Sequence, residues 1–377
     1  MDRRGFVTSG MAAGLAGLTT GGVSLGALLD AGLGPTSAWT DADDTIRLSS
    51  NENPLGVSPA AREAIIGAIV DANRYGGRRQ ELLDALATHL GVETENLTLG
   101  FGSTEILQIC TQAFQGPNTP LIAAEPTFED VMGYQDTMPF EVLTVPLLPD
   151  GQHDVQRMRE LSLLRPSVVY ICNPNNPTGT ITDSADIDAW IDEAPDTTTF
   201  LLDEAYLEYA TDARYHEALA WTGRKPNVVV IRTFSKIFGM AGLRLGYAVS
   251  HPTTAARLEE HTIYNSPGML ASAAALASLR DEGLIERSLA VNEEAKAIVH
   301  TTLDELGLAY LPTNTNFIMH RINGDLETYR ERMMERGIRV GRDFPPMLDH
   351  NRLSFGLPSE MDQWASAIRD FRTRGWI

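Results

Sequence analysis

Residues 233–244 read Thr233-Phe234-Ser235-Lys236-Ile237-Phe238-Gly239-Met240-Ala241-Gly242-Leu243-Arg244 and follow the β-branched run 228–231. Such a run predicts a buried strand, which places Lys236 just past the end of that strand. An amine in a pocket there loses part of its hydration, which lowers its pKa and makes it a Schiff-base nucleophile. The hydroxyls of Thr233 and Ser235 and the guanidinium of Arg244 are suitable ligands for a phosphate. A surface lysine at a strand-to-loop turn is the alternative.

Polar residues also follow three other predicted strands. The run 200–202 leads into Asp203, and a carboxylate at the end of an apolar strand is costly unless a cation accompanies it. The run 168–171 leads into a proline-rich loop that contains Asn176. The simpler interpretations are a helix cap for the aspartate and a turn-forming residue for the asparagine.

The remaining strand, 97–100, precedes Ser103 and Thr104 at the start of a predicted helix, 106–114. Free backbone N–H groups at the positive end of a helix dipole suit an anion. Strands alternate with helical stretches, and the polar residues follow the strands' carboxyl ends. This pattern predicts a doubly wound, mostly parallel α/β sheet with a ligand at that edge.

The complete set resembles the fold-type I pyridoxal phosphate (PLP) enzymes, in which a lysine after S/T-x-S is followed eight residues later by arginine, as Lys236 is by Arg244. Together with Asn51-Glu52-Asn53-Pro54-Leu55-Gly56, it is similar to the histidinol-phosphate aminotransferase branch of the class I/II aminotransferases. The resemblance covers residues from about 49 to about 356. It implies PLP as cofactor, the PLP-transferase fold with a smaller α/β C-terminal domain, and transamination between an amino acid and a 2-oxo acid through a Lys236 Schiff base.

The resemblance also implies a role for individual side chains. Lys236, Asp203 and Tyr206 are the predicted catalytic residues, with Asp203 on the pyridine nitrogen and Tyr206 on the phenolic oxygen. The predicted cofactor-binding residues are Ser103, Thr104, Phe128, Asn176, Asp203, Tyr206, Thr233, Ser235, Lys236 and Arg244, with Tyr75 reaching the partner's cofactor phosphate across a homodimer interface. The predicted substrate-binding residues are Asn53, Leu55, Asn176 and Arg352, of which Arg352 grips the α-carboxylate.

A chain of 377 residues favours two lobes. The predicted organisation is a signal peptide at 1–38, an N-terminal arm and first helix at 39–71, a large PLP-binding domain at 72–268 and a small domain at 269–377. Other predicted elements include a helix capped by Ser58, helices 80–90, 269–279 and 284–306, and strands 121–124, 315–319 and 353–355.

Net charge and cysteine spacing disfavour several classes of partner and site. A formal net charge of −20 disfavours nucleic acid and an anionic membrane surface. The two cysteines, Cys110 and Cys172, lack metal-ligand spacing, so no metal site is predicted. Cys172 follows a predicted strand, which favours a buried thiol over a disulfide.

The first forty residues resemble a twin-arginine export signal. Arg3 and Arg4 precede a run at 11–29 that is rich in Ala, Gly and Leu, and Thr36-Ser37-Ala38 offers small residues for cleavage near Ala38. We therefore predict export in the folded state through the twin-arginine (Tat) translocon, no stable membrane anchor, and a periplasmic mature protein. A transmembrane anchor or a disordered tail is the alternative, although the glycines make a poor membrane helix.

The substrate is less well specified. Gly341 falls where the biosynthetic relatives often have an arginine, and Arg342 follows it. An exported enzyme also does not fit a step of cytosolic histidine synthesis, so an amino-acid aminotransferase is predicted ahead of histidinol-phosphate transamination. A decarboxylase of the phosphothreonine type remains the alternative on the same scaffold. A non-catalytic PLP-binding module is disfavoured, because binding alone needs no Schiff-base lysine together with a partner for the pyridine nitrogen.

Overall fold

The computed structural model describes residues 45–377, so the predicted signal peptide and its cleavage site lie outside the described residues. Seven strands form one large sheet in the order β2-β8-β7-β6-β5-β3-β4. Their bounds are β2 (Leu97–Gly100), β3 (Leu121–Glu125), β4 (Val142–Pro146), β5 (Ser167–Cys172), β6 (Thr198–Asp203), β7 (Val228–Thr233) and β8 (Gly246–Ser250). Only β8 runs antiparallel to its neighbours within this sheet, which confirms the mostly parallel prediction.

Both faces of this sheet are buried, because alternate strand residues enter two separate cores. Val169, Phe200 and Val230 pack in one core, whereas Val168 and Leu201 pack in the other. Near-continuous apolar strands are the expected consequence of helices on both faces. The helices of this lobe are α2 (Pro59–Ala68), α3 (Arg79–Leu90), α4 (Gly102–Phe114), α5 (Asp130–Gly133), α6 (Val155–Ser162), α7 (Ser184–Glu193), α8 (Pro252–Glu259) and α9 (Met269–Leu279).

Helix ends follow the local signals in the sequence. The Ser58 side chain accepts a hydrogen bond from Ala61 N and caps α2, with Pro59 in its first turn, as predicted. Gly91 adopts φ 68° at the end of α3. The helix predicted at 106–114 begins earlier, at Gly102, which places Ser103 and Thr104 within its first turn.

A second lobe has its own core. Its elements are β1 (Ile46–Leu48), β9 (Phe317–Arg321), β10 (Ile338–Val340), β11 (His350–Ser354), α10 (Leu284–Leu306), α11 (Leu326–Glu335) and α12 (Pro358–Thr373). β9 pairs antiparallel with β11, and β1 from the N-terminal arm pairs parallel with β10. Trp364, Phe371 and Leu48 are among the residues of this core.

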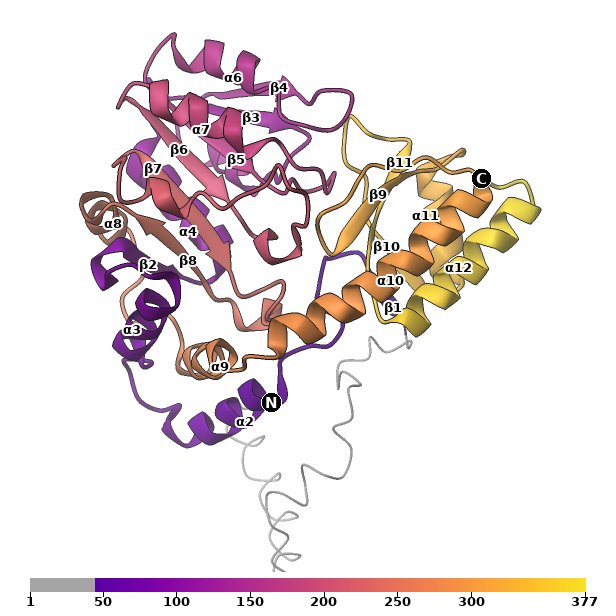
Figure 1. Ribbon diagram of the computed structural model, residues 1–377, viewed down its shortest axis with the longest axis horizontal. Coiled ribbons are helices and arrows are strands. Elements are labelled where there is room, and N and C mark those ends of the chain that lie inside the picture. Colours follow the sequence, from indigo (N-terminus) through magenta and orange to yellow (C-terminus); the bar gives the residue numbers. More distant parts are fainter. Residues whose placement is uncertain (1–44) are drawn as a thin grey trace, which may run out of the picture. The chain divides into compact units, whose positions relative to one another are not determined.

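The long helix α10 joins the two lobes. Leu284, near its start, packs in the core of the large lobe, and Val299, further along, packs in the core of the second lobe. Figure 1 shows α10 running from α9 to a position alongside α12. Residues of α9, where the predicted small domain begins, pack in the core of the large lobe against α2. Within residues 45–377, no helix combines the length and apolar character of a membrane span.

Candidate active site

The polar residues predicted to follow the strands meet at the carboxyl edge of the large sheet. Asp203, the last residue of β6, pairs with Cys172 of β5, and Thr233, the last residue of β7, pairs with Gly246 of β8. A cavity of about 250 Å³ lies at this edge. It is lined by Ser50, Glu52, Ser103, Thr104, Phe128, Cys172, Asn176, Asp203, Ala205, Tyr206, Thr233, Ser235, Lys236, Ala241 and Arg244. The fold therefore brings together residues from six separate segments of the sequence, most of them following strands of the large sheet.

Lys236 lies in the loop that follows β7, and its amine faces this cavity. Its Nζ donates a hydrogen bond to Asn51 O over 3.3 Å and lies 5.4 Å from the ring centroid of Tyr206. Burial, reinforced by the positive charge of Arg352, lowers the pKa of Lys236 to about 8. Since a neutral amine is the nucleophilic form, this shift prepares Lys236 for reaction near neutral pH.

Asp203 provides a buried carboxylate on the floor of the cavity. Its Oδ2 accepts a hydrogen bond from Tyr170 Oη over 2.9 Å, and its Oδ1 accepts one from Ala205 N over 3.1 Å. Burial raises the pKa of Asp203 to about 6, and the two hydrogen bonds oppose that rise. A cationic ring nitrogen is the kind of partner that stabilises a carboxylate in such a place.

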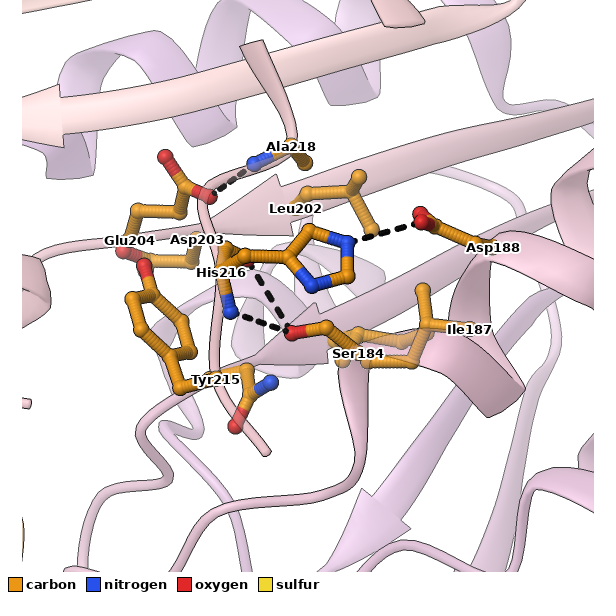
Figure 2. Close-up of a pocket in the computed structure, with 11 residues that line it drawn as sticks. Ser184, Ile187, Asp188, Leu202, Asp203, Glu204, Tyr215, His216 and Ala218 are labelled. Atoms are coloured by element: carbon orange, nitrogen blue, oxygen red, sulfur yellow. Dashed lines mark hydrogen bonds and ion pairs between the residues drawn. The ribbon is translucent and has the colours of Figure 1, made fainter. Parts of the chain in front are cut away.

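The next residue, Glu204, follows the end of β6 and holds it through hydrogen bonds to Arg232 and Ala218. Its Oε2 accepts hydrogen bonds from Arg232 Nε and Nη2 over 3.0 and 2.8 Å, and its Oε1 accepts one from Ala218 N over 2.6 Å. Figure 2 shows this last contact together with the hydrogen bond between His216 and Asp188. The space enclosed there measures about 20 Å³, which is room for about one water and too small for a substrate.

An anion cradle lies beside Lys236. Ser103 and Thr104 occupy the first turn of α4, where the backbone N–H groups are free to bind an anion. Arg244 Nη1 lies 3.5 Å from Ser235 Oγ. Gly102 has φ +81°, and a Cβ there would lie 2.4 Å from Arg244 Nη2, so a larger residue would displace this guanidinium. The cradle offers hydroxyl, backbone and guanidinium donors, which is a donor set for phosphate.

Arg352, from β11, enters the site from the second lobe. Its Nη1 donates to Asn176 Oδ1 over 2.7 Å, and its Nη2 donates to Ser49 O over 2.7 Å. Its Nε is buried and has no hydrogen-bond partner among residues 45–377. Burial lowers the pKa of Arg352 to about 10, which still leaves it charged at neutral pH.

Tyr206 and Asn51 form a pair that the sequence did not reveal. Asn51 Nδ2 donates to Tyr206 Oη over 3.0 Å, so the phenolic hydrogen of Tyr206 remains available to donate to another oxygen. Burial raises the pKa of Tyr206, which keeps this hydroxyl protonated. Asn51 has φ 54°, a left-handed conformation that asparagine tolerates better than most residues, so its residue type was the signal that the sequence offered.

Asn53, Leu55 and Arg352 are not among the residues that line the cavity, so the substrate-binding roles predicted for them stay predictions. Arg352 reaches its border through the hydrogen bond to Asn176, which does line it. Asn53 Nδ2 donates to Ile237 O and Ser288 Oγ over 2.8 and 3.0 Å, and Asn53 Oδ1 accepts from Leu55 N. These contacts anchor the arm to the lysine loop and to α10. Ser50 and Glu52 face the cavity instead.

Two other predicted features lie outside the cavity. Tyr75 is 90% exposed on this chain, so its role across a homodimer interface stays a prediction. At Gly341 a Cβ would lie 2.2 Å from the carbonyl oxygen of Arg352, which leaves no space for an arginine there without a backbone shift. Cys172 is a buried free thiol, as predicted.

The residues of the cavity fit the PLP that the sequence resemblance implies. The cradle of Ser103, Ser235 and Arg244 matches a phosphate, and the Asp203 carboxylate matches a protonated pyridine nitrogen. The hydroxyl of Tyr206 and the amide of Asn176 can donate to a phenolic oxygen. Each of these donors or acceptors lines the same cavity as the Lys236 amine.

Comparisons with known proteins agree with this geometry. Residues 43–368 match the family Aminotransferase class I and II. A histidinol-phosphate aminotransferase of Moorella thermoacetica is 38% identical, over 79% of this chain and 77% of that protein. The crystal structure of a putative histidinol-phosphate aminotransferase from Erwinia carotovora atroseptica is 36% identical, with a TM-score of 0.87 over 89% of this chain and 98% of that one. The Sinorhizobium meliloti histidinol-phosphate aminotransferase, solved in complex with pyridoxal-5'-phosphate, is 27% identical, with a TM-score of 0.81 over 87% and 91% of the two chains.

Proposed function

The chain belongs to the aminotransferase class I and II family and is a PLP-dependent aminotransferase, and we propose that its amino donor is an α-amino acid whose carboxylate binds Arg352. The observation that supports this choice is the position of Arg352. Its guanidinium is buried, is held by Asn176 and Ser49, and carries a single positive charge. One guanidinium matches the single charge of a carboxylate.

Bound in this cavity, PLP supplies a reactive carbonyl carbon and a pyridine ring that withdraws electrons. Asp203 holds the ring nitrogen in its protonated form, since a buried carboxylate stabilises a cation beside it. Lys236 Nζ moves a proton to and from the substrate Cα, for which a pKa of about 8 is well placed near neutral pH. Tyr206 and Asn176 donate hydrogen bonds to the phenolic oxygen, and the α4 cradle holds the phosphate.

A 2-oxo acid uses the same contacts in the second half of the reaction. It carries a carboxylate in the position that the amino acid carried, so Arg352 orients both the donor and the acceptor. Orientation by a fixed guanidinium places the substrate Cα within reach of Lys236 in each half-reaction. One site therefore serves alternating donor and acceptor, as a ping-pong order requires.

Histidinol phosphate is the second candidate donor, because the relatives named above carry that activity in their names. A phosphate monoester carries a charge of about −1.5 to −2 at neutral pH and calls for more than one cation. Gly341 supplies no second cation, and Arg342 is already paired with Glu129. The charge balance of the site thus favours the amino acid.

The test is a half-reaction screen with the purified holoenzyme. Each candidate donor, including L-histidinol phosphate and a panel of L-amino acids, is mixed without any 2-oxo acid, and the visible absorbance of the cofactor is followed. We expect amino acids to convert the cofactor at higher second-order rate constants than histidinol phosphate. A faster conversion by histidinol phosphate than by every amino acid would reverse the assignment. Release of carbon dioxide in continuous turnover without an oxo acid would identify a decarboxylase.

The proposal includes a homodimer in which Tyr75 contacts the partner's cofactor phosphate. Large apolar side chains are exposed on this chain, among them Ile69 at 55%, Val70 at 80% and Tyr264 at 90%. Exposed apolar groups of this size are typical of a protein–protein interface. Light scattering should give twice the chain mass, and Tyr75→Phe should weaken PLP binding without changing that mass. A monomeric active enzyme would contradict this part.

The proposal also includes export through the twin-arginine route to the periplasm, based on Arg3, Arg4 and the apolar run that follows them. The family match begins at residue 43, so these residues precede the matched region. Fractionation of cells that express the full chain should find the protein in the periplasm, shortened near Ala38. Arg3→Lys together with Arg4→Lys keeps the charge and should retain the full-length protein inside the cell. Equal export of both forms would exclude this route.

A further inference from the structure

Arg342 forms an ion pair across the rim of the active site. It lies in the loop after β10, and its Nη2 lies 2.5 Å from Glu129 Oε1. Glu129 is the residue before α5 and directly follows Phe128, which lines the cavity. Both charged side chains are about half exposed. The pair therefore connects the second lobe to the large lobe at the mouth of the cavity.

Phe344 couples this ion pair to the carboxylate-binding arginine. The guanidinium carbon of Arg342 lies 4.3 Å from the ring centroid of Phe344, and that of Arg352 lies 4.6 Å from the same centroid. Phe344 is only 5% exposed, so its ring is held in place. Two guanidinium groups thus contact one fixed aromatic ring.

The charges of Arg342 and Glu129 change the pKa of Arg352. Burial is the main cause that lowers the pKa of Arg352, the positive charge of Arg342 lowers it further, and the negative charge of Glu129 raises it. Arg342 and Glu129 thus act on the same group with opposite signs. As long as they are paired, their net effect on an anion bound at Arg352 is small, whereas an unpaired Arg342 would add attraction.

We propose that Glu129 is a positioning residue that sets the anion preference of the site. By retaining Arg342, it leaves Arg352 as a single cation that suits a carboxylate and disfavours the greater charge of a phosphate. This inference deepens the amino-acid preference proposed above and rests on that function. Arg342 is the group through which Glu129 acts, and Phe344 holds Arg342 close enough to reach the anion when Glu129 is removed.

The test compares two unreactive ligands on the holoenzyme. 3-(Imidazol-4-yl)propionate and 3-(imidazol-4-yl)propyl phosphate lack an amino group, so neither starts the reaction, and they differ mainly in the anion. Calorimetry gives the dissociation constant of each for the wild type and for Glu129→Gln at low salt. Because one charge at a half-exposed rim has a modest effect, we expect the variant to bind the phosphate about three- to fivefold more tightly. The carboxylate affinity should change less than about twofold.

Two controls isolate Arg342 as the mediator. The double variant Glu129→Gln with Arg342→Gln should lose the gain in phosphate affinity, since no freed guanidinium remains. Asp130→Asn removes a neighbouring carboxylate but leaves the Glu129–Arg342 pair, and it should leave the ratio of the two affinities near the wild-type value. An unchanged ratio in Glu129→Gln, or an equal gain in Asp130→Asn, would overturn the inference.

The role of Glu129 and the preference for an amino-acid donor are tested by different measurements. The amino-acid preference is judged by which donor the wild type converts, whereas this inference is judged by a ratio of affinities between variants for ligands that do not react. If the wild type prefers histidinol phosphate and Glu129→Gln still shifts the ratio, the proposed donor is wrong and the role of Glu129 stands. If amino acids are preferred and the ratio stays constant, Glu129 does not set the preference.

Discussion

Replacing Asn51 tests how the N-terminal arm holds the site together. The side chain is 1% exposed and adopts φ 54°. Its Nδ2 donates to Tyr206 Oη over 3.0 Å, and its Oδ1 accepts from Ser354 Oγ over 2.9 Å. Asn51→Ala removes both side-chain hydrogen bonds and places alanine in the left-handed region. Asn51→Gly removes the same bonds without the left-handed cost.

The magnitudes follow from these contacts. Two buried hydrogen bonds contribute about 1 kcal/mol each, and a left-handed alanine costs about 1 kcal/mol more. Asn51→Ala should therefore lower the free energy of unfolding by about 3 kcal/mol. Glycine in an ordinary conformation is less stable than alanine, because it has more freedom in the unfolded chain, but a positive φ reverses that order. We expect Asn51→Gly to be the more stable variant by about 0.5–1 kcal/mol.

The assay is equilibrium unfolding in urea, with the midpoint and slope measured for all three proteins. Protein and PLP concentrations are kept fixed, because ligand binding and association shift apparent stability by mass action. An alanine variant as stable as the glycine variant, or more stable, would refute the argument from φ. A loss below about 1 kcal/mol in both variants would refute the argument from the hydrogen bonds.

Three further predictions concern the lysine, the buried histidines and Gly341. Lys236→Ala should lower turnover by about 10²–10⁴-fold. Reduction with borohydride should add the mass of the cofactor to the wild type but not to the variant. An equal adduct on both proteins would contradict the role of Lys236 as the Schiff-base lysine. Burial lowers the pKa of His153 and His320 to about 4 from 6.5, so protonation favours the unfolded chain. Stability should fall as pH drops from about 6.5 to 4, by at most about 3 kcal/mol for each histidine, and His320→Gln should show a shallower pH dependence in urea titrations. Gly341→Ala and Gly341→Arg should both raise KM for the amino donor about tenfold, because a Cβ would meet the carbonyl of Arg352; an unchanged KM for alanine would show that the backbone adapts.

Much of the fold could be predicted because its signals are local. The β-branched and apolar runs that became β5, β6 and β7 are readable from neighbouring residues alone. The start of α2 and the end of α3 follow from one capping residue each. The line-up of Asp203, Asn176 and Lys236 at one edge follows from a general property of parallel sheets, whose carboxyl ends meet.

The arm was the part that local patterns could not resolve. Asn51, Glu52, Asn53 and Leu55 read as one polar loop, yet Asn51 and Glu52 serve the site and Asn53 anchors the backbone. Which side chain faces the cavity depends on the positive φ of Asn51 and on partners far away in the sequence, such as Ser354. No local pattern encodes either condition.

The sequence by itself determined the sheet and the cofactor, because these depend on burial patterns and on residue types at fixed spacing. The tertiary structure alone decided how charges from distant segments combine. Glu129 and Arg342 are 213 positions apart, and only the tertiary fold brings them into contact. Electrostatic interactions depend on distance in space and not on separation along the chain, so the contact on which the proposed anion preference rests is decided by the tertiary structure.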